Sequence, residues 1–206
     1  MQPRIPRQPA QDRGGIHADD DAGLGAGPAA VVAGARRRAV RDGDRQVDTA
    51  HLLHSLIESD PDVRAVIGDA PQLARLLGYL VQRSIGYGLR WQSGIEDSGA
   101  LPALPHAERR AEGKGKGDGA WSPVAAAALE YARSRARRRG AAHSDGIDLL
   151  AGLVLDPESR AVQVLERAGV AARELAVRID GDGAVGAAGP VGAVPDAEAE
   201  RRTSGR

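Results

Sequence analysis

The residues best placed for metal chemistry in this chain are two histidines, His51 and His54, which lie three positions apart. On a helix that spacing places both rings on one face, where imidazole nitrogens could share a metal ion. No neighbouring carboxylate clearly completes such a site. We therefore interpret the pair as part of a capped, partly buried helix start, and we expect neither a metal site nor a cofactor.

The serines and acids do not form a recognisable catalytic pattern. Ser55, Ser122 and Ser144 lack the Gly-x-Ser-x-Gly context of a nucleophile elbow. Asp145 and Asp148 are better explained by favourable electrostatics at a helix N-terminus than by acid–base work. We expect no catalytic residues and no enzyme. A hydrolase is kept as an alternative, which cleavage of a substrate by the purified protein alone would establish.

A Gly- and Lys-containing run at 112–118 is the only stretch that resembles a phosphate-binding loop. Its Lys116 is followed by Gly117, whereas a P-loop continues from Lys to Ser or Thr. No strand precedes the run and no helix follows it directly. We expect this chain neither to bind nor to hydrolyse ATP.

Arginine runs are the strongest competing signal. One run lies at 36–38 with Arg41, and a second lies at 133–139. On equivalent helices they would form two basic strips, suited to phosphate backbones. Few aromatic residues are available for base stacking, and no groove-reading motif is present. We favour a solvated face, with an acidic protein partner as the second interpretation and nucleic acid as the third.

Composition narrows the class of protein. The 206 residues carry a net charge of zero and include no Cys and no Phe. Disulfides and thiolate metal sites are therefore excluded, and the core must consist of Leu, Val, Ile and Ala, which favours close helix packing. No apolar run approaches the ~20 residues that cross a bilayer, and the N-terminus lacks a signal-peptide core. We expect an all-α, cytoplasmic protein without membrane contact.

One helical pattern occurs twice. The segment 46–57 begins with capping residues and continues into an apolar face, and a weaker copy lies ninety-seven residues later at 143–154. At the same offset, small residues of the preceding helix also match: Ala35, Ala39 and Gly43 correspond to Ala132, Ala136 and Gly140. The chain is therefore predicted to contain one four-helix unit used twice.

The domain boundaries follow from where helical periodicity begins and ends. Residues 1–24 and 181–206 are predicted to be disordered tails, since polar, Gly and Pro residues cannot bury enough surface to offset the entropy of ordering. The periodic part spans 25–180 and divides into repeat one (25–86), a long flexible linker (87–120) and repeat two (121–180).

Three motifs, taken in order, resemble the Clp N-terminal (Clp R) repeat domain of Clp chaperone-ATPases. They are Thr49-Ala50-His51-Leu52-Leu53, the Ser122-Pro123 helix start, and the segment 164–170. The resemblance covers roughly residues 25–180. It implies a pseudo-twofold bundle of eight helices that acts as a docking platform for substrates and adaptors and has no catalytic activity of its own.

Two departures from that family change the expected function. The Glu that usually stands between Thr and His is replaced by Ala50 and Ile147, and the hydroxyl of Ser122 is matched by Gly25 in the first unit. A methyl or butyl group cannot pair with a guanidinium, which argues against phosphoarginine recognition. The ATPase modules that follow this domain in Clp proteins have no counterpart before Arg206.

The resemblance implies a non-catalytic, stand-alone Clp N-like module that binds peptides or proteins. Its expected partners are protein substrates, adaptors, or components of a Clp ATPase or protease, and the chain would act as an accessory or a decoy in Clp-dependent proteolysis. The candidate contact residues are Trp121, Ser122, Thr49 and His51. A structural alternative for Trp121 is that it only staples the helix start. A basic helical nucleic-acid binder is the alternative function.

Overall fold

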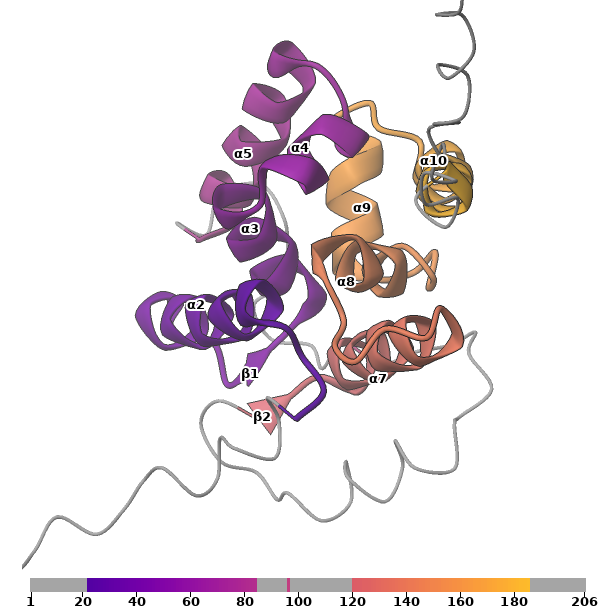
Figure 1. The fold of residues 1–206 in the computed structure, drawn as a ribbon. Coiled ribbons are helices and arrows are strands. Elements are labelled where there is room, and N and C mark those ends of the chain that lie inside the picture. The colour runs from indigo at the N-terminus through magenta and orange to yellow at the C-terminus, as the bar shows by residue number, and fades with distance from the viewer. Residues whose placement is uncertain (1–21, 85–95, 97–119, 186–206) are drawn as a thin grey trace, which may run out of the picture.

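A computed structural model describes residues 22–84, 96 and 120–185 of the chain. These residues form eight helices and one short pair of strands, arranged as two four-helix units (Figure 1). The prediction of an all-α fold built from two four-helix repeats is confirmed. Within the described ranges, no helix is long and apolar enough to cross a membrane.

The first unit contains helices whose ends carry clear local signals. Its elements are α2 (Ala26–Asp42), β1 (Gln46–Val47), α3 (Thr49–Ser59), α4 (Pro61–Ile67) and α5 (Ala70–Ser84). Gly43 ends α2 in the left-handed conformation (φ 72°), which glycine adopts without a steric penalty. Asp60 caps α4 through its side chain, and Pro61 occupies the first helical position.

The second unit repeats this order. Its elements are β2 (Ala120–Trp121), α7 (Pro123–Arg138), α8 (Gly146–Leu153), α9 (Arg160–Arg167) and α10 (Ala172–Val185). Ser122 and Ser159 accept backbone hydrogen bonds as the caps of α7 and α9. Helix α10 continues to Val185, five residues into the segment predicted to be the C-terminal tail.

Short extended segments of one unit pair with short extended segments of the other. Strand β1 pairs in parallel with β2, with Val47 opposite Trp121, and an isolated bridge joins Leu24 to Ser144. Both pairs obey the ninety-seven-residue offset, because 24 + 97 = 121 and 47 + 97 = 144. The same contact is therefore made twice around the pseudo-twofold relation, and it holds the start of each unit against the helix pair of the other.

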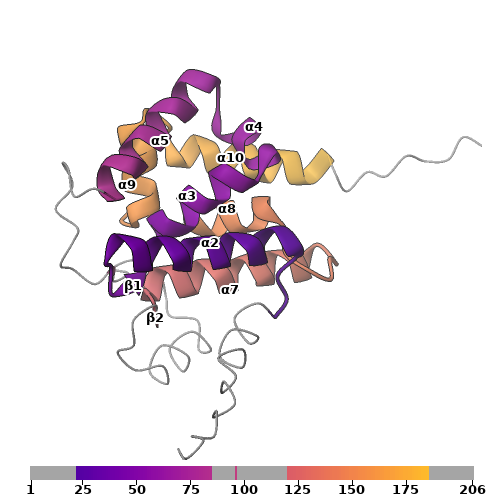
Figure 2. The same cartoon turned by 90° about the vertical axis from the view of Figure 1, so that its left-hand side faces the viewer.

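The core is continuous across the units, and among the residues that the structure describes no aromatic side chain is fully buried. Its largest buried side chains are Leu and Ile: Leu52, Leu53, Leu56, Ile57, Ile67, Leu76, Leu80, Leu149, Leu150, Leu153, Leu165 and Leu175. Helix α9 packs against α3 and α5, and α4 packs against α8 and α10. The units therefore share one core, while α2 and α7 cover the same side of it (Figure 2).

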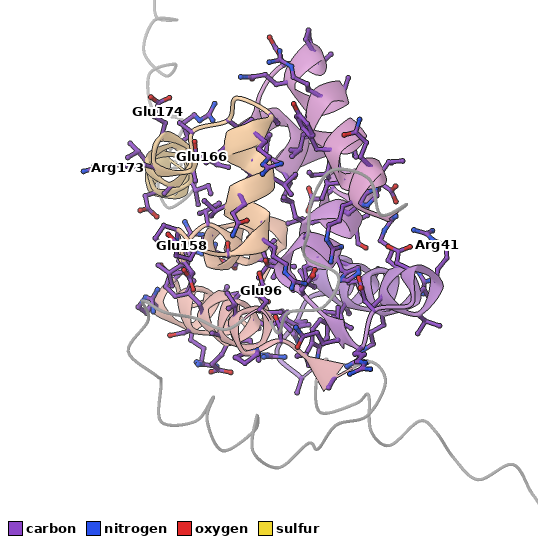
Figure 3. All side chains as sticks on the ribbon, turned by 180° about the vertical axis from the view of Figure 1, so that it is seen from behind. Arg41, Glu96, Glu158, Glu166, Arg173 and Glu174 are labelled. Atoms are coloured by element: carbon purple, nitrogen blue, oxygen red, sulfur yellow. The ribbon has the colours of Figure 1, made fainter. Side chains whose placement is uncertain are left out.

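Of the predicted flexible linker (87–120), the structure describes Glu96 and Ala120 alone. The Glu96 side chain is buried among the helices (5% exposed; Figure 3). The flexibility of the rest of the linker stays a prediction. The stretch at 112–118 lies outside the described residues.

Candidate binding site at the junction of the two units

The site is built around the start of α3. Asp48 caps this helix, accepting a hydrogen bond from the backbone N–H of His51 (3.0 Å). The His51 ring closes the capping box, since its Nδ1 accepts from the backbone N–H of Asp48 (3.1 Å). Together these bonds satisfy two donors at the start of the helix and fix the His51 ring beside the carboxylate.

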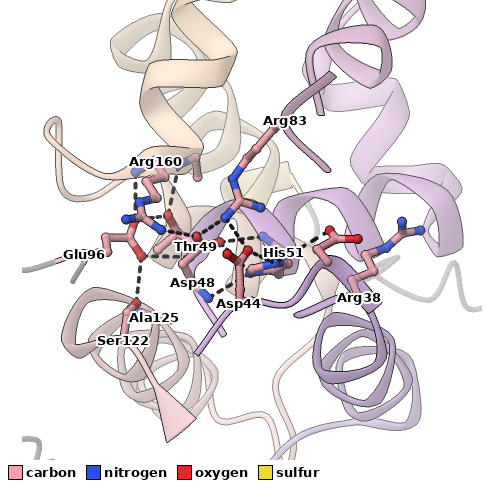
Figure 4. A network of polar contacts seen from close by, with 12 residues as sticks. Arg38, Asp44, Asp48, Thr49, His51, Arg83, Glu96, Ser122, Ala125 and Arg160 are labelled. Atoms are coloured by element: carbon pink, nitrogen blue, oxygen red, sulfur yellow. Dashed lines mark hydrogen bonds and ion pairs between the residues drawn. The ribbon is translucent and has the colours of Figure 1, made fainter. Parts of the chain in front are cut away.

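Arginines from both units converge on Asp48. Arg83 of α5 pairs with it, and Arg160 of α9 contacts the same carboxylate oxygen at 2.6 Å (Figure 4). Burial by itself would raise the pKa of Asp48, but the hydrogen bond from His51 and the charges of His51 and Arg83 hold that pKa well below its usual range. Asp48 is therefore an ionised, fully buried link between the units.

The pKa of His51 is shifted by two neighbouring carboxylates. Burial by itself would lower the pKa of its imidazole, but the hydrogen-bonded side chains of Asp44 and Asp48 raise it. The Nε2 atom lies 3.0 Å from Asp44 Oδ2. Arg83 also contacts Asp44 (3.2 Å), so the acids and bases form one compensated network.

Asp44, Asp48 and His51 bring three potential ligand atoms within 4.8 Å of one another. The expectation that no carboxylate beside His51 completes a set of ligands is thus corrected: Asp48 lies three residues before His51, and Asp44 approaches through the turn before α3. The guanidinium of Arg83 contacts both carboxylates, and that of Arg160 contacts Asp48. Since arginines already supply the positive charge that a cation would provide, we assign this cluster a structural role.

A second carboxylate, that of Glu96, lies where helices α3, α7 and α9 begin. It accepts hydrogen bonds from the Thr49 backbone N–H (2.9 Å), the Ser122 hydroxyl (2.7 Å) and the Arg160 backbone N–H (2.7 Å). The Thr49 hydroxyl is a fourth partner. We call Thr49, Glu96, Ser122 and Arg160 the junction site (Figure 4).

The structure brings two of the four candidate contact residues onto one carboxylate. Thr49 and Ser122 both bind Glu96, and His51 lies beside them on Asp48. All three candidates are buried, whereas Trp121 stays partly exposed, with the Arg36 guanidinium 5.1 Å from its ring centre. Of the four candidates, Trp121 is therefore the one that is accessible at the surface.

Sequence reasoning missed Glu96, Arg83 and Arg160 as members of the site. Arg160 is the first residue of a helix, which its cap Ser159 makes recognisable, but nothing local connects it to Asp48, 112 residues away. Glu96 lies in a stretch without periodicity.

Most arginines of the second run form ion pairs with acids of their own unit. Arg133 and Arg135 are buried, and Arg135 pairs with Asp148 at 2.8 Å. Arg139 pairs with Asp145 at 3.0 Å and also contacts Asp148. This strip is therefore a set of intramolecular ion pairs more than a free basic surface.

The first arginine run borders a cleft of about 340 Å³ between α2 and α3. Its lining is Ala30, Gly34, Arg37, Arg38, Arg41, Ser55, Glu58 and Ser59. Arg38 is bound to Glu58 and donates to the Ser55 hydroxyl (3.2 Å). Arg41 lies at the exposed edge (Figure 3). The cleft contains both signs of charge, which does not match the uniformly positive lining that a nucleic-acid backbone requires.

His54, beside this cleft, makes stability depend on pH. Burial and the positive charge of Arg38 lower its pKa to about 4, against 6.5 for a free histidine. The unfolded chain then binds more protons than the folded chain between these values, so stability is full above pH 6.5 and falls as the pH drops. Between pH 6.5 and 5 we expect a loss of about 2 kcal/mol from this group.

Urea unfolding of the wild type and of His54→Gln, measured from pH 7.5 to 5, tests this expectation. The variant should show the shallower dependence on pH, since glutamine does not titrate. Parallel curves for the two proteins would contradict the assignment.

Comparison with known proteins identifies the fold. No family model and no curated protein sequence matches the chain. Among solved structures, the N-terminal domain of the caseinolytic protease-associated chaperone ClpD from Arabidopsis thaliana superposes with a TM-score of 0.54 at 20% identity. The match covers 78% of this chain and 94% of that domain.

A second structure, from preliminary investigations of a malarial protein secretion system, has the same TM-score at 14% identity and covers 78% of this chain and 95% of its own. The fold is thus similar to that of a Clp N-terminal domain. At these identities the likeness concerns the fold alone.

Proposed function

We propose that this chain is a non-catalytic protein-binding module, related in its role to the docking domain of Clp ATPases. The observation that supports it best is the junction site, where both units contribute donors to a single carboxylate. Donors that converge on one acceptor from separate helices can recognise an anionic group. The likeness to the ClpD N-terminal domain, which extends over 94% of that domain, is consistent with this role.

The proposed partners are protein substrates, adaptors, or subunits of a Clp ATPase or protease, with the chain as an accessory or a competitor. Trp121 marks the entry point, because it is the partly exposed aromatic next to Ser122. Aromatic residues beside buried polar groups are frequent anchors in protein interfaces.

Site-specific photocrosslinking tests the proposal. A photoreactive amino acid at position 121 should capture a Clp ATPase, a Clp protease subunit or an adaptor from a lysate of the source organism. The same probe at Val177, which is 69% exposed on α10, is the matched control and should capture much less of it. Crosslinks to nucleic acid alone, or equal capture of the same protein from both positions, would contradict a docking surface at Trp121.

The alternative of nucleic-acid binding is less favoured, because Arg135 and Arg139 are paired within the fold and Arg133 is buried. It would require an affinity for DNA or RNA that falls steeply with salt. The hydrolase alternative would require cleavage of a substrate by the purified protein without a partner.

A further inference from the structure

The junction site directs four hydrogen-bond donors at one group, so it matches a group that offers acceptors. The Thr49 hydroxyl accepts from the Ala161 backbone N–H (3.0 Å), and the Ser122 hydroxyl accepts from the Ala125 backbone N–H (3.0 Å). Because a carboxylate oxygen accepts, both hydroxyls donate their hydrogens to Glu96. The other two donors, the backbone N–H groups of Thr49 and Arg160, cannot reverse their polarity.

The donors come from three helix starts, which also favour a negative charge. Thr49 is the first residue of α3, Ser122 is the cap of α7, and Arg160 is the first residue of α9. Each helix start carries a partial positive charge. The neighbouring anion, Asp48, is already compensated by arginines. A carboxylate therefore matches this site in hydrogen bonding and in charge.

Glu96 reaches the site along the chain, twelve residues after Ser84 and twenty-four before Ala120 (96 − 84 = 12; 120 − 96 = 24). A ligand tethered in this way is present at a local concentration on the order of millimolar, so it fills even a weak site. Because the donors belong to Thr49, Ser122 and Arg160, the Glu96 carboxylate can be removed by substitution without removing any of them.

We propose that the junction site is a carboxylate-binding site, and that Glu96 is its internal ligand, which an acidic side chain of a partner protein replaces. The site itself is independent of any partner, whereas the replacement by a partner rests on the proposed function. Glu96 enters as an internal side chain, which indicates that the incoming group is also the side chain of an Asp or Glu and not a chain terminus.

Acetate is the probe for the site itself. In Glu96→Ala the four donors lose their acceptor, and acetate should fill the space. With a Kd on the order of 10 mM, 100 mM sodium acetate lowers the unfolding equilibrium constant about tenfold relative to sodium chloride of equal ionic strength. Wild type and Glu158→Ala, which removes an exposed carboxylate, should show no such difference.

Adding Ser122→Ala to Glu96→Ala should reduce the acetate effect, because one of the four donors is lost. If Glu96→Ala is unfolded, acetate should instead restore its helical circular dichroism. The proposal is overturned if acetate stabilises wild type and Glu96→Ala equally. It is also overturned if acetate neither stabilises a folded Glu96→Ala variant nor restores the helical signal of an unfolded one.

Paired peptides test the replacement. Two amidated peptides that differ only in one internal residue, Glu or Gln, are titrated into Glu96→Ala and into wild type. The Glu peptide should bind the variant at least tenfold more tightly than the Gln peptide does, and it should bind wild type more weakly than the variant, since Glu96 competes. Equal binding of the two peptides overturns the partner claim, as does preference for a Gln peptide with a free C-terminus.

The two sets of results separate the proposals. An acetate effect without crosslinks at Trp121 contradicts the proposed docking function and supports the carboxylate site. Crosslinks at Trp121 without an acetate effect support the proposed docking function and contradict the carboxylate site.

Discussion

Replacing Asp48 by alanine is expected to lower the free energy of unfolding by roughly 3–5 kcal/mol, because it leaves the buried charges of Arg83 and Arg160 without their common partner. The same change removes the cap of α3. Urea unfolding at pH 7 measures the loss.

The pseudo-symmetric counterpart, Asp145→Ala, is the control, since 48 + 97 = 145. Asp145 caps α8 in the same way, but its side chain is 55% exposed, so the cap and an exposed ion pair with Arg139 are lost, at about 1 kcal/mol in total. Equal losses for the two variants would show that the buried network around Asp48 contributes nothing beyond the cap.

The Asp48 carboxylate also predicts the direction in which the free energy of unfolding changes with pH. Because the folded state holds its pKa below the unfolded value of 3.8, its contribution is full above that pH and is lost as the pH falls further. In Asp48→Ala this acid-dependent part of the stability should be missing. A wild-type and a variant curve that stay parallel below pH 4 would contradict the shift.

Replacing Gly152 by alanine is expected to destabilise the fold by about 3 kcal/mol or more. A Cβ at this position of α8 would overlap the carbonyl oxygen of Ala128 on α7 and lie 3.0 Å from its carbonyl carbon. The obstacle is backbone, so no change of rotamer relieves it, and the two helices must separate.

Gly78→Ala is the matched control, because Gly78 lies in the interior of α5, is exposed, and has nothing within 4 Å of the added methyl group. There the same substitution should stabilise by about 0.5–1 kcal/mol, since alanine loses less backbone entropy on folding. Thermal unfolding of both variants gives the comparison. A Gly152→Ala variant as stable as wild type would mean that α7 and α8 are not packed this closely.

The repeat itself was predictable because its signals are local. The caps Asp48 and Ser122, the stop at Gly43 and the spacing of Leu52, Leu53 and Leu56 each involve residues within one or two helical turns. Such patterns determine helix type and approximate bounds. They also indicated correctly that Leu and Ile, with close-packed Ala faces, would make the core.

The arginine runs illustrate what local patterns do not determine. Read along the sequence, Arg135 and Arg139 belong to a basic strip that faces solvent. In the structure both are paired with Asp148, and Arg135 is buried. Whether a charge on a helix faces solvent or a carboxylate depends on which helix packs against it, and that is a tertiary property.

What the sequence by itself determined is the duplicated four-helix unit, its caps and the composition of its core. What only the tertiary structure decided is the junction site. Thr49 and Glu96 are separated by 47 residues, Arg160 and Glu96 by 64, and Arg160 and Asp48 by 112. The Arg160–Asp48 pair forms because the second unit's α9 packs on the first unit's α3 and brings the two helix starts together, and Glu96 binds where those starts meet. Helical periodicity records which face of a helix is buried, but not which distant residue meets it there.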